Sequence, residues 1–236
     1  MDDDVALMDR HDTKYVMSRA HFQTVLPLLL DEYRVLEVVG KRISQYENLY
    51  FDAKGLPFYH HHQRGKRNRV KVRMRKYTDS DITFLEIKHK NNKGRTVKSR
   101  KQIEDIDPLL DSEDISFLNE AYELNLSLNP AIANSFHRIT LVHKEKEERL
   151  TFDLELKFET NDHRHFEISD LVIAELKQDE YNRESTFAKL AKQLQIRPER
   201  LSKYCLGIAL LFDNVKKNQI KRKLRRIAKI SEELAA

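Results

Sequence analysis

The chain has 236 residues, of which 40% are hydrophobic and 34% are charged, and its formal net charge is +5. This length allows one large domain or two small ones. The single cysteine, Cys205, excludes an internal disulfide framework and is typical of a reducing compartment. The sequence has no apolar run long enough to cross a bilayer, and its N-terminus is acidic, unlike a signal peptide. We therefore expect a cytoplasmic protein without a transmembrane segment.

The first third of the chain predicts a helix, a strand and a short connection. Residues 18–33 place apolar side chains at helical spacing after Ser18, a plausible N-cap, with Pro27 inside the predicted helix. Residues 43–51 are typical of a strand, and residues 56–63 indicate a short helix or an irregular connection.

The segment Arg69–Arg75 is the most informative part of the sequence. Every odd position in it is basic and every even position is apolar, so a strand would carry four cations on one face. Residues 82–89 and 96–103 predict two further strands, the first joined to 69–77 by the turn at 78–81. Like charges in a row repel, which indicates an anionic partner or an exposed face.

The rest of the chain predicts one helix, then three strands, then three helices. Residues 107–125 predict an acidic helix, and residues 138–144, 150–158 and 171–177 predict strands. The predicted C-terminal helices cover residues 185–194, 201–212 and 216–229. No linker divides the chain, so we expect one domain over residues 1–215 and a basic C-terminal helix within residues 216–236.

Together these elements predict an α+β protein built on a large antiparallel sheet. Strand after strand has one apolar and one ionic face. Alternation alone is most typical of an open sheet with one face in water. The sharper interpretation closes the sheet into a barrel, with the ionic faces pointing inward and the apolar faces under helices. Asp153 then becomes either a metal ligand or the partner of an inward arginine.

The ionic faces hold many cations and few carboxylates. Arginine binds phosphate oxygens with two parallel hydrogen bonds, whereas lysine acts as a mobile point charge. A carboxylate among such cations can hold a divalent metal that bridges phosphates. These are the groups that phosphoryl transfer needs, because positioning and charge stabilisation dominate its catalysis.

Eight short motifs, in order along the chain, resemble the polyphosphate polymerase (VTC) domain family of the triphosphate tunnel (CYTH-like) superfamily. The resemblance extends from about Arg10 to Leu210. The motifs are residues 10–15, 48–52, 71–75, 84–88, 97–100, Arg138 with 149–153, 173–177 and 201–204.

This resemblance implies an eight-stranded antiparallel β-barrel tunnel with flanking helices. It implies transfer of the γ-phosphoryl group of ATP to a growing polyphosphate chain, with Mn²⁺ or Mg²⁺ as cofactor. The phosphate ligands would be Lys14, Arg73, Arg75, Lys88, Lys98, Arg138, Arg149 and Lys203, with Arg100 and Lys177 as further substrate-binding residues. Glu175 would hold the metal, with Glu86 as a second carboxylate.

The sequence departs from the superfamily at the first strand, where a Glu-x-Glu-x-Lys motif is replaced by Arg10, Asp12 and Lys14. This departure weakens a first-strand metal site and argues against a simple triphosphatase. The alternatives are an inorganic or nucleoside triphosphatase with the same site, and a polyphosphate-binding module without catalysis. The basic segment 64–76 lacks the interleaved aromatic residues of single-strand nucleic-acid platforms, which disfavours nucleic acid as a partner.

Overall fold

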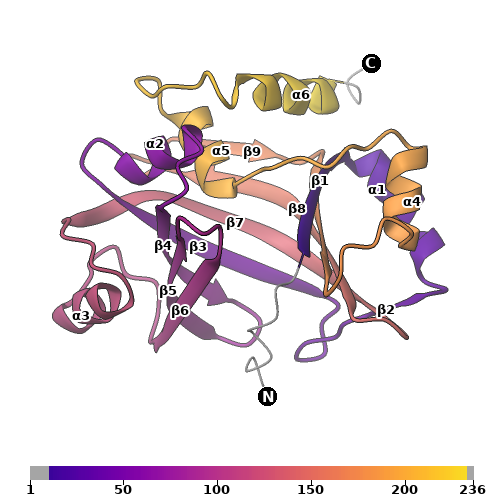
Figure 1. Ribbon diagram of the computed structural model, residues 1–236, viewed down its shortest axis with the longest axis horizontal. Helices are drawn as coiled ribbons and strands as arrows, with labels where there is room; N and C mark the ends of the chain where they lie inside the picture. Colours follow the sequence, from indigo (N-terminus) through magenta and orange to yellow (C-terminus); the bar gives the residue numbers. More distant parts are fainter. Residues whose placement is uncertain (1–10, 233–236) are drawn as a thin grey trace.

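A computed structural model describes residues 11–232 of the chain, with side chains to residue 230. Within this range it contains ten strands and six helices, shown in Figure 1. The strands are β1 (His11–Ser18), β2 (Tyr33–Val35), β3 (Ile43–Ala53), β4 (Arg69–Tyr77), β5 (Ile82–Lys90), β6 (Thr96–Ile103), β7 (Leu128–His143), β8 (Glu148–Glu159), β9 (His165–Ile168) and β10 (Leu171–Gln178). The helices are α1 (Arg19–Leu29), α2 (Pro57–Gln63), α3 (Ser112–Ala121), α4 (Thr186–Gln193), α5 (Lys203–Leu211) and α6 (Lys221–Glu232).

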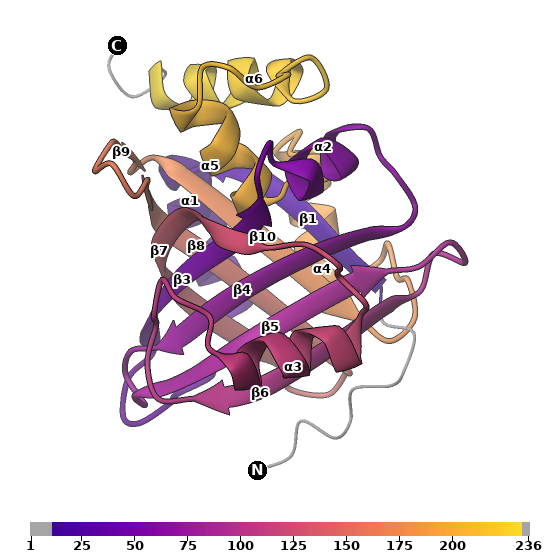
Figure 2. The same ribbon diagram turned by 90° about the vertical axis from the view of Figure 1, so that its left-hand side faces the viewer.

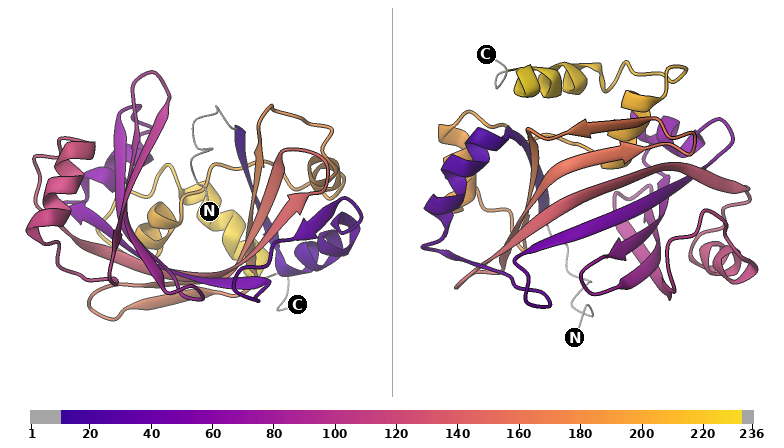
Figure 3. Two further views of the ribbon diagram at one scale, coloured as in Figure 1. Left: turned by 90° about the horizontal axis from the view of Figure 1, so that it is seen from below. Right: turned by 180° about the vertical axis from the view of Figure 1, so that it is seen from behind.

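All ten strands belong to one antiparallel sheet. Eight of them follow the order β1-β10-β8-β7-β3-β4-β5-β6, while β2 pairs with β7 and β9 pairs with β8. Viewed from below, the sheet curves strongly, so that β4, β5 and β6 face β1, β8 and β10 (Figure 3, left). The α+β antiparallel architecture is as predicted.

The expected closed barrel is not formed, because among the described residues β1 and β6 are not paired with each other. Both edge strands carry lysine on the face that looks into the curve, Lys14 on β1 and Lys98 on β6. Charged side chains on an edge strand discourage further pairing, which accounts for the open seam.

The outer face of the sheet is apolar and is covered by helices. Helices α1 and α4 pack on β1, β10, β8 and β7 through a cluster that includes Phe22, Phe152 and Phe187. Helix α3 covers β5 and β6 from the outside (Figure 2) and inserts Leu118 into the cluster formed by residues such as Met74. The apolar positions of each strand therefore face helices and leave the ionic positions to the concave side.

Helix α5 packs against the other side of the sheet, at one end of the concave face. Gly207 of α5 meets Phe158 and Ile132, and a Cβ added there would lie 2.5 Å and 2.6 Å from their side chains. Ile132 lies on the same face of β7 as Asn134, two residues further along the strand. Glycine thus lets α5 approach the sheet closely and bring its first residue, Lys203, to the concave face.

Four helices begin at a side-chain N-cap, of which the sequence predicted Ser18, and two helices are much shorter than predicted. The side chains of Ser18, Asp111, Ser185 and Ser202 each accept a hydrogen bond from a backbone N–H in the first turn of α1, α3, α4 and α5. The expected helix over residues 18–33 ends at Leu29, soon after Pro27, and the next residues form β2. The expected helix over residues 107–125 is restricted to α3 because Asp111 caps it late.

The C-terminal basic segment forms the helix α6, and its apolar stripe is buried. Ile220, Ile227 and Ile230 join the cluster that contains α2 and α5. Arg226 of α6 lies 3.1 Å from Glu199, in the segment between α4 and α5. Within residues 11–232, none of the helices has the length and apolar character needed to span a membrane.

The close approach at Gly207 gives a stability prediction. Gly207→Ala should lower the free energy of unfolding by about 1–3 kcal/mol, since the added methyl group forces Phe158 and Ile132 to move. Chemical denaturation measures this loss. Phe158→Leu removes one of the two obstacles, so the double variant should lose less stability than the sum of the two single variants. Simple additivity would contradict the proposed contact.

Candidate functional site: carboxylates between paired cations

The concave face, defined here as the side of the sheet that bears Arg73, Glu86, Asp153 and Glu175, contains three carboxylates that each lie between two cations. Each group of three draws its residues from two or three separate chain segments. Arranged in this way, the carboxylates reduce the repulsion between cations but leave each group with a net positive charge.

Glu86 on β5 forms the first group with Arg73 on β4 and Lys98 on β6. In the register of these strands, Glu86 lies opposite Arg73, and Lys98 is two residues from its partner on β6. Arg73 Nη2 and Lys98 Nζ lie 2.6 Å and 2.8 Å from the Glu86 carboxylate, which is only 2% exposed. Burial opposes ionisation of Glu86, but Arg73, Arg75 and Lys98 outweigh burial and lower its pKa to about 2.

Asp153 on β8 forms the second group with Arg138 on β7 and Lys203 on α5. Arg138 donates two hydrogen bonds to Asp153, from Nε at 2.6 Å and from Nη2 at 2.9 Å, and Lys203 donates a third. Burial would raise the pKa of Asp153, but the charges of Arg138 and Lys203 hold it well below its usual range. The structure thus pairs Asp153 with the inward arginine.

The position of Lys203 in this group disfavours its charged form, because the ammonium group is buried. Burial lowers the pKa of Lys203, Asp153 opposes that effect, and Arg138 lowers it further, to about 8. Tyr46 and Phe136 stack beneath these cations with ring centroids 5.2 Å apart. Arg138 lies 4.9 Å from the Tyr46 ring centroid and Lys203 lies 4.2 Å from that of Phe136. The two rings therefore stabilise Arg138 and Lys203 through cation–π interactions, since these two cations share a single carboxylate, Asp153.

Glu175 on β10 forms the third and loosest group. Lys14 Nζ lies 3.5 Å from its carboxylate and Lys177 Nζ lies 3.9 Å away. Burial opposes ionisation of Glu175, but Lys14, Lys177 and Arg138 outweigh it and lower its pKa to about 2. Asp12, next to Lys14 on the same face of β1, has its pKa raised by burial and by the charge of Glu175, although Lys177 opposes the shift.

The two sides of the curved sheet interact across the concave face. Lys88 on β5 is electrostatically coupled to Lys14 on β1 and Glu175 on β10, although β5 and β1 lie far apart in the strand order. Lys71, whose pKa burial lowers to about 8, is also repelled by Lys14 and Lys88. The curvature thus brings cations from distant segments close enough together to bind the same anion.

Arg75 occupies a different environment from the other cations. It is 8% exposed and donates from Nε to the Asn48 side chain at 2.7 Å, while Asn48 donates to Asn134 at 2.9 Å. One buried polar atom of this network, Asn134 Nδ2, has no hydrogen-bond partner among the described residues. Unsatisfied buried polar groups are uncommon and indicate a place where a ligand can bind.

The remaining predicted site residues lie at the margins of the concave face. Arg100 is exposed on the edge strand β6, with its guanidinium 4.7 Å from the Phe84 ring centroid. Arg149 is exposed on β8 and lies opposite Lys177 in the strand register. Arg10 lies outside the described residues.

Several residues that the sequence did not single out belong to this site. Tyr50 accepts a hydrogen bond from Arg73 at 3.2 Å, and although burial opposes ionisation, Arg73 and Arg75 lower the pKa of Tyr50 to about 8. Asn48 and Asn134 position Arg75. Tyr50 and Asn48 share the alternate positions of β3 with Tyr46, the one signal in the sequence that could have placed them on the ionic face.

The carboxylates differ in how well they suit a divalent metal. The two Glu86 oxygens already lie within 2.8 Å of Lys98 and Arg73, which leaves them little capacity for a metal. Glu175 contacts its lysines more loosely, and Asp12 is a diagonal neighbour of Glu175 on the paired strand β1. No cluster of three or more metal-ligating side chains occurs within the described part of the chain. Glu175 with Asp12 therefore fits Mg²⁺ or Mn²⁺ only where substrate phosphates and water complete the coordination.

Comparison with protein families decides the relationship. Residues 9–212 match the family model of the VTC domain. The chain belongs to the VTC domain family. The resemblance drawn from the ordered motifs is thereby confirmed, and the VTC match covers all of the residues discussed above as members of the site.

The structure of a protein from Bacillus halodurans shows the same fold at low sequence identity, and a second structure is also similar. A candidate adenylate cyclase from Bacillus halodurans is 14% identical, with a TM-score of 0.51 over 87% of this chain and 100% of that chain. A candidate adenylyl cyclase from Hippeastrum with a dominant triphosphatase activity is 12% identical, with a TM-score of 0.46 over 86% of this chain and 98% of that chain. A search of curated proteins gives no match.

The ion pairs of Glu86 give a prediction about pH. The folded pKa of about 2 lies below the ordinary value of 4.5, so the stability from these pairs is fully present above about pH 4.5. It is lost as pH falls toward 2. Glu86→Gln should therefore cost about 3–5 kcal/mol of unfolding free energy near neutral pH, because two cations lose a buried partner.

Urea denaturation of both proteins at pH 6 and pH 3 measures this effect. The difference between wild type and Glu86→Gln should shrink at pH 3. The same difference at both pH values would show that Glu86 does not stabilise the fold through its charge.

Proposed function

We propose that this VTC domain protein is a metal-dependent polyphosphate polymerase, which binds the triphosphate of ATP on the concave face and transfers its γ-phosphoryl group to a polyphosphate chain. The observation that supports this most directly is the arrangement of Glu86, Asp153 and Glu175, each between two cations from separate segments. A linear anion with several phosphate groups suits a row of such groups better than a single phosphate does.

The carboxylates act as internal counter-ions that hold the cations in place. Arg138 uses Nε and Nη2 to bind Asp153, and Arg73 uses Nε and Nη2 to bind Glu86. Fixed guanidinium groups lose little conformational entropy when a phosphate binds their remaining N–H groups. Lys14, Lys98 and Lys203 can turn from their carboxylates toward phosphate oxygens, because an ammonium group has no fixed orientation.

The chain's own residues then favour transfer by neutralising charge. The attacking group is a phosphate oxygen at the chain end, which is ionised already and needs no general base. Repulsion between this acceptor and the γ-phosphate opposes the reaction, and the cations of the concave face reduce it. Attack at phosphorus breaks the bond to the β-phosphate oxygen and releases ADP.

A divalent metal would be held by Glu175, with Asp12 beside it, and would withdraw charge from the phosphate oxygens when bound. Glu86 would then serve to position Arg73 and Lys98, since its oxygens are engaged with them.

Product length tests the proposed reaction. Incubation of the protein with ATP and Mn²⁺ should yield ADP and phosphate chains that lengthen with time, resolved on a polyacrylamide gel. Orthophosphate as the sole phosphate product would identify a triphosphatase instead. Binding of polyphosphate without ATP consumption would identify a binding module.

A substitution at Glu175 tests the metal assignment. Glu175→Gln should lower the metal-dependent rate of ADP formation by about 100-fold or more, since a bound divalent metal contributes several kcal/mol of charge stabilisation. Glu167→Gln is the matched control, because Glu167 is exposed on β9, where it contacts Lys157 and Ser169. A Glu175→Gln protein with the wild-type rate and metal requirement would exclude this role.

A further inference from the structure

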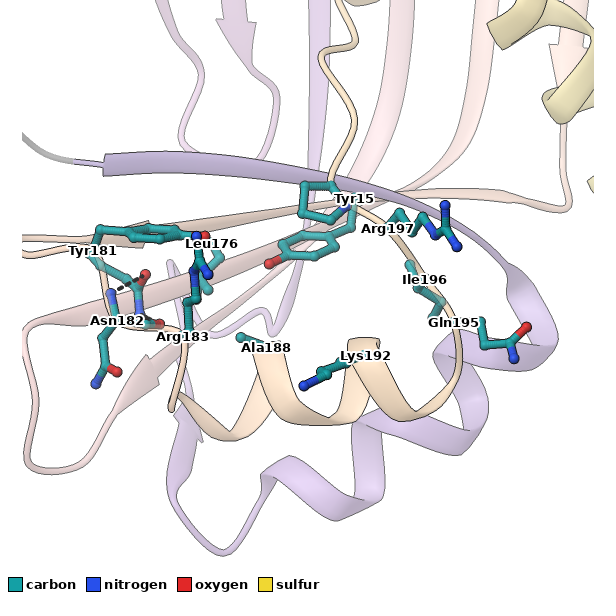
Figure 4. A pocket seen from close by; sticks show the side chains of 12 residues that line it. Tyr15, Leu176, Tyr181, Asn182, Arg183, Ala188, Lys192, Gln195, Ile196 and Arg197 are labelled. Atoms are coloured by element: carbon teal, nitrogen blue, oxygen red, sulfur yellow. Dashed lines mark hydrogen bonds between the residues drawn. The ribbon is translucent and has the colours of Figure 1, made fainter.

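A cavity lies on the outer side of the sheet, away from the concave face. This outer cavity, of about 430 Å³, lies between β1, the end of β10, helix α4 and the segment after α4 (Figure 4). Its volume falls in the range of small-molecule sites, about 300–1,000 Å³. Tyr15 forms part of its wall, and the preceding residue, Lys14, points to the opposite face of β1.

The outer cavity is lined by cations without counter-ions. Arg183, Lys192 and Arg197 all line it, and its lining includes no aspartate or glutamate. None of these three side chains forms an ion pair with the described residues. Three unpaired cations around one concavity attract an anion, and two of them are arginines, which suit phosphate or carboxylate.

Aromatic groups lie between and beside these cations. Tyr181 is 50% exposed at one end of the cavity, with the Arg183 guanidinium 5.5 Å from its ring centroid (Figure 4). The buried Tyr15 ring lies between that end and Arg197, held by an edge-to-face contact with Phe187. Tyrosine rings and arginine planes are the surfaces on which flat nucleobases stack.

The walls of the outer cavity are fixed by hydrogen bonds that do not involve the cations. Gln178 donates to the Asn182 carbonyl at 3.0 Å and accepts from the Asn182 N–H at 3.3 Å, which anchors the segment bearing Tyr181 and Arg183. On the other side, the Ile196 N–H donates to Ala191, and Pro198 is bridged to Tyr15. The cavity is thus preformed, which lowers the entropic cost of binding.

We propose that the outer cavity binds a nucleoside monophosphate, with the base against Tyr181 and Arg183 and the phosphate near Lys192 and Arg197. This site is separate from the concave face and does not depend on the reaction proposed for it. The ligand class follows from the pairing of aromatic surfaces at one end with unpaired cations along the rest of the cavity.

Isothermal titration of the full chain with AMP tests this proposal. Wild type should bind AMP, and Lys192→Gln/Arg197→Gln should bind it at least about tenfold more weakly, since charge-assisted hydrogen bonds are lost. Tyr181→Ala should also weaken binding by removing the stacking surface. Lys189→Gln is the matched control on α4, because Lys189 pairs with Glu184 outside the cavity. It should bind AMP like wild type.

Two further titrations separate the ligand's parts and its location. Adenosine and inorganic phosphate should each bind more weakly than AMP, and Arg73→Gln/Arg138→Gln on the concave face should bind AMP like wild type. The proposal is overturned if wild type does not bind AMP, if the double variant binds it like wild type, or if inorganic phosphate binds as tightly. Loss of AMP binding in Arg73→Gln/Arg138→Gln would place the nucleotide on the concave face and would equally overturn it.

Discussion

Repulsion between cations on the concave face is the constraint on which the rest of the structure depends. The alternation within β4 places Lys71, Arg73 and Arg75 on one face, and curvature of the sheet brings Lys14 near Lys88. Burying so many cations without negatively charged partners would strongly destabilise the folded protein. Three carboxylates supply them, and because each lies between two cations, the face remains positive overall and suited to a polyanion.

The same constraint explains features of the fold that lie away from the carboxylates. The seam between β1 and β6 stays open where both edge strands carry lysine, and an open seam leaves the concave face accessible. Gly207 lets α5 settle onto Ile132 and Phe158, which brings Lys203 to Asp153. The apolar outer faces, covered by α1, α3 and α4, stabilise a sheet whose inner side contributes less to hydrophobic burial.

The sequence predicted the elements whose pattern is local and missed those that depend on partners. Strand β4 has the predicted bounds because its alternation is complete, whereas β2 and β9 are too short to show a pattern. Strand β7 begins at Leu128, ten residues before its predicted start, in a stretch that contains Pro130. The site follows the same rule: the sequence indicates that Glu86 lies on an ionic face, but its ion pairs with Arg73 and Lys98 depend on strand register. Lys203 reaches Asp153 from a helix, which no strand pattern could indicate.

The central claim is that cations from separate segments of the concave face bind one polyphosphate anion together. Titration of tripolyphosphate at several salt concentrations, with wild type and with Arg73→Gln/Arg138→Gln, tests it most directly. The account predicts binding to one site, weakening steeply with salt, and a loss of about 100-fold or more in the double variant. Arg222→Gln/Arg225→Gln on α6 should bind like wild type. Failure of wild type to bind, or equal binding by the Arg73 and Arg138 variant, would contradict the account.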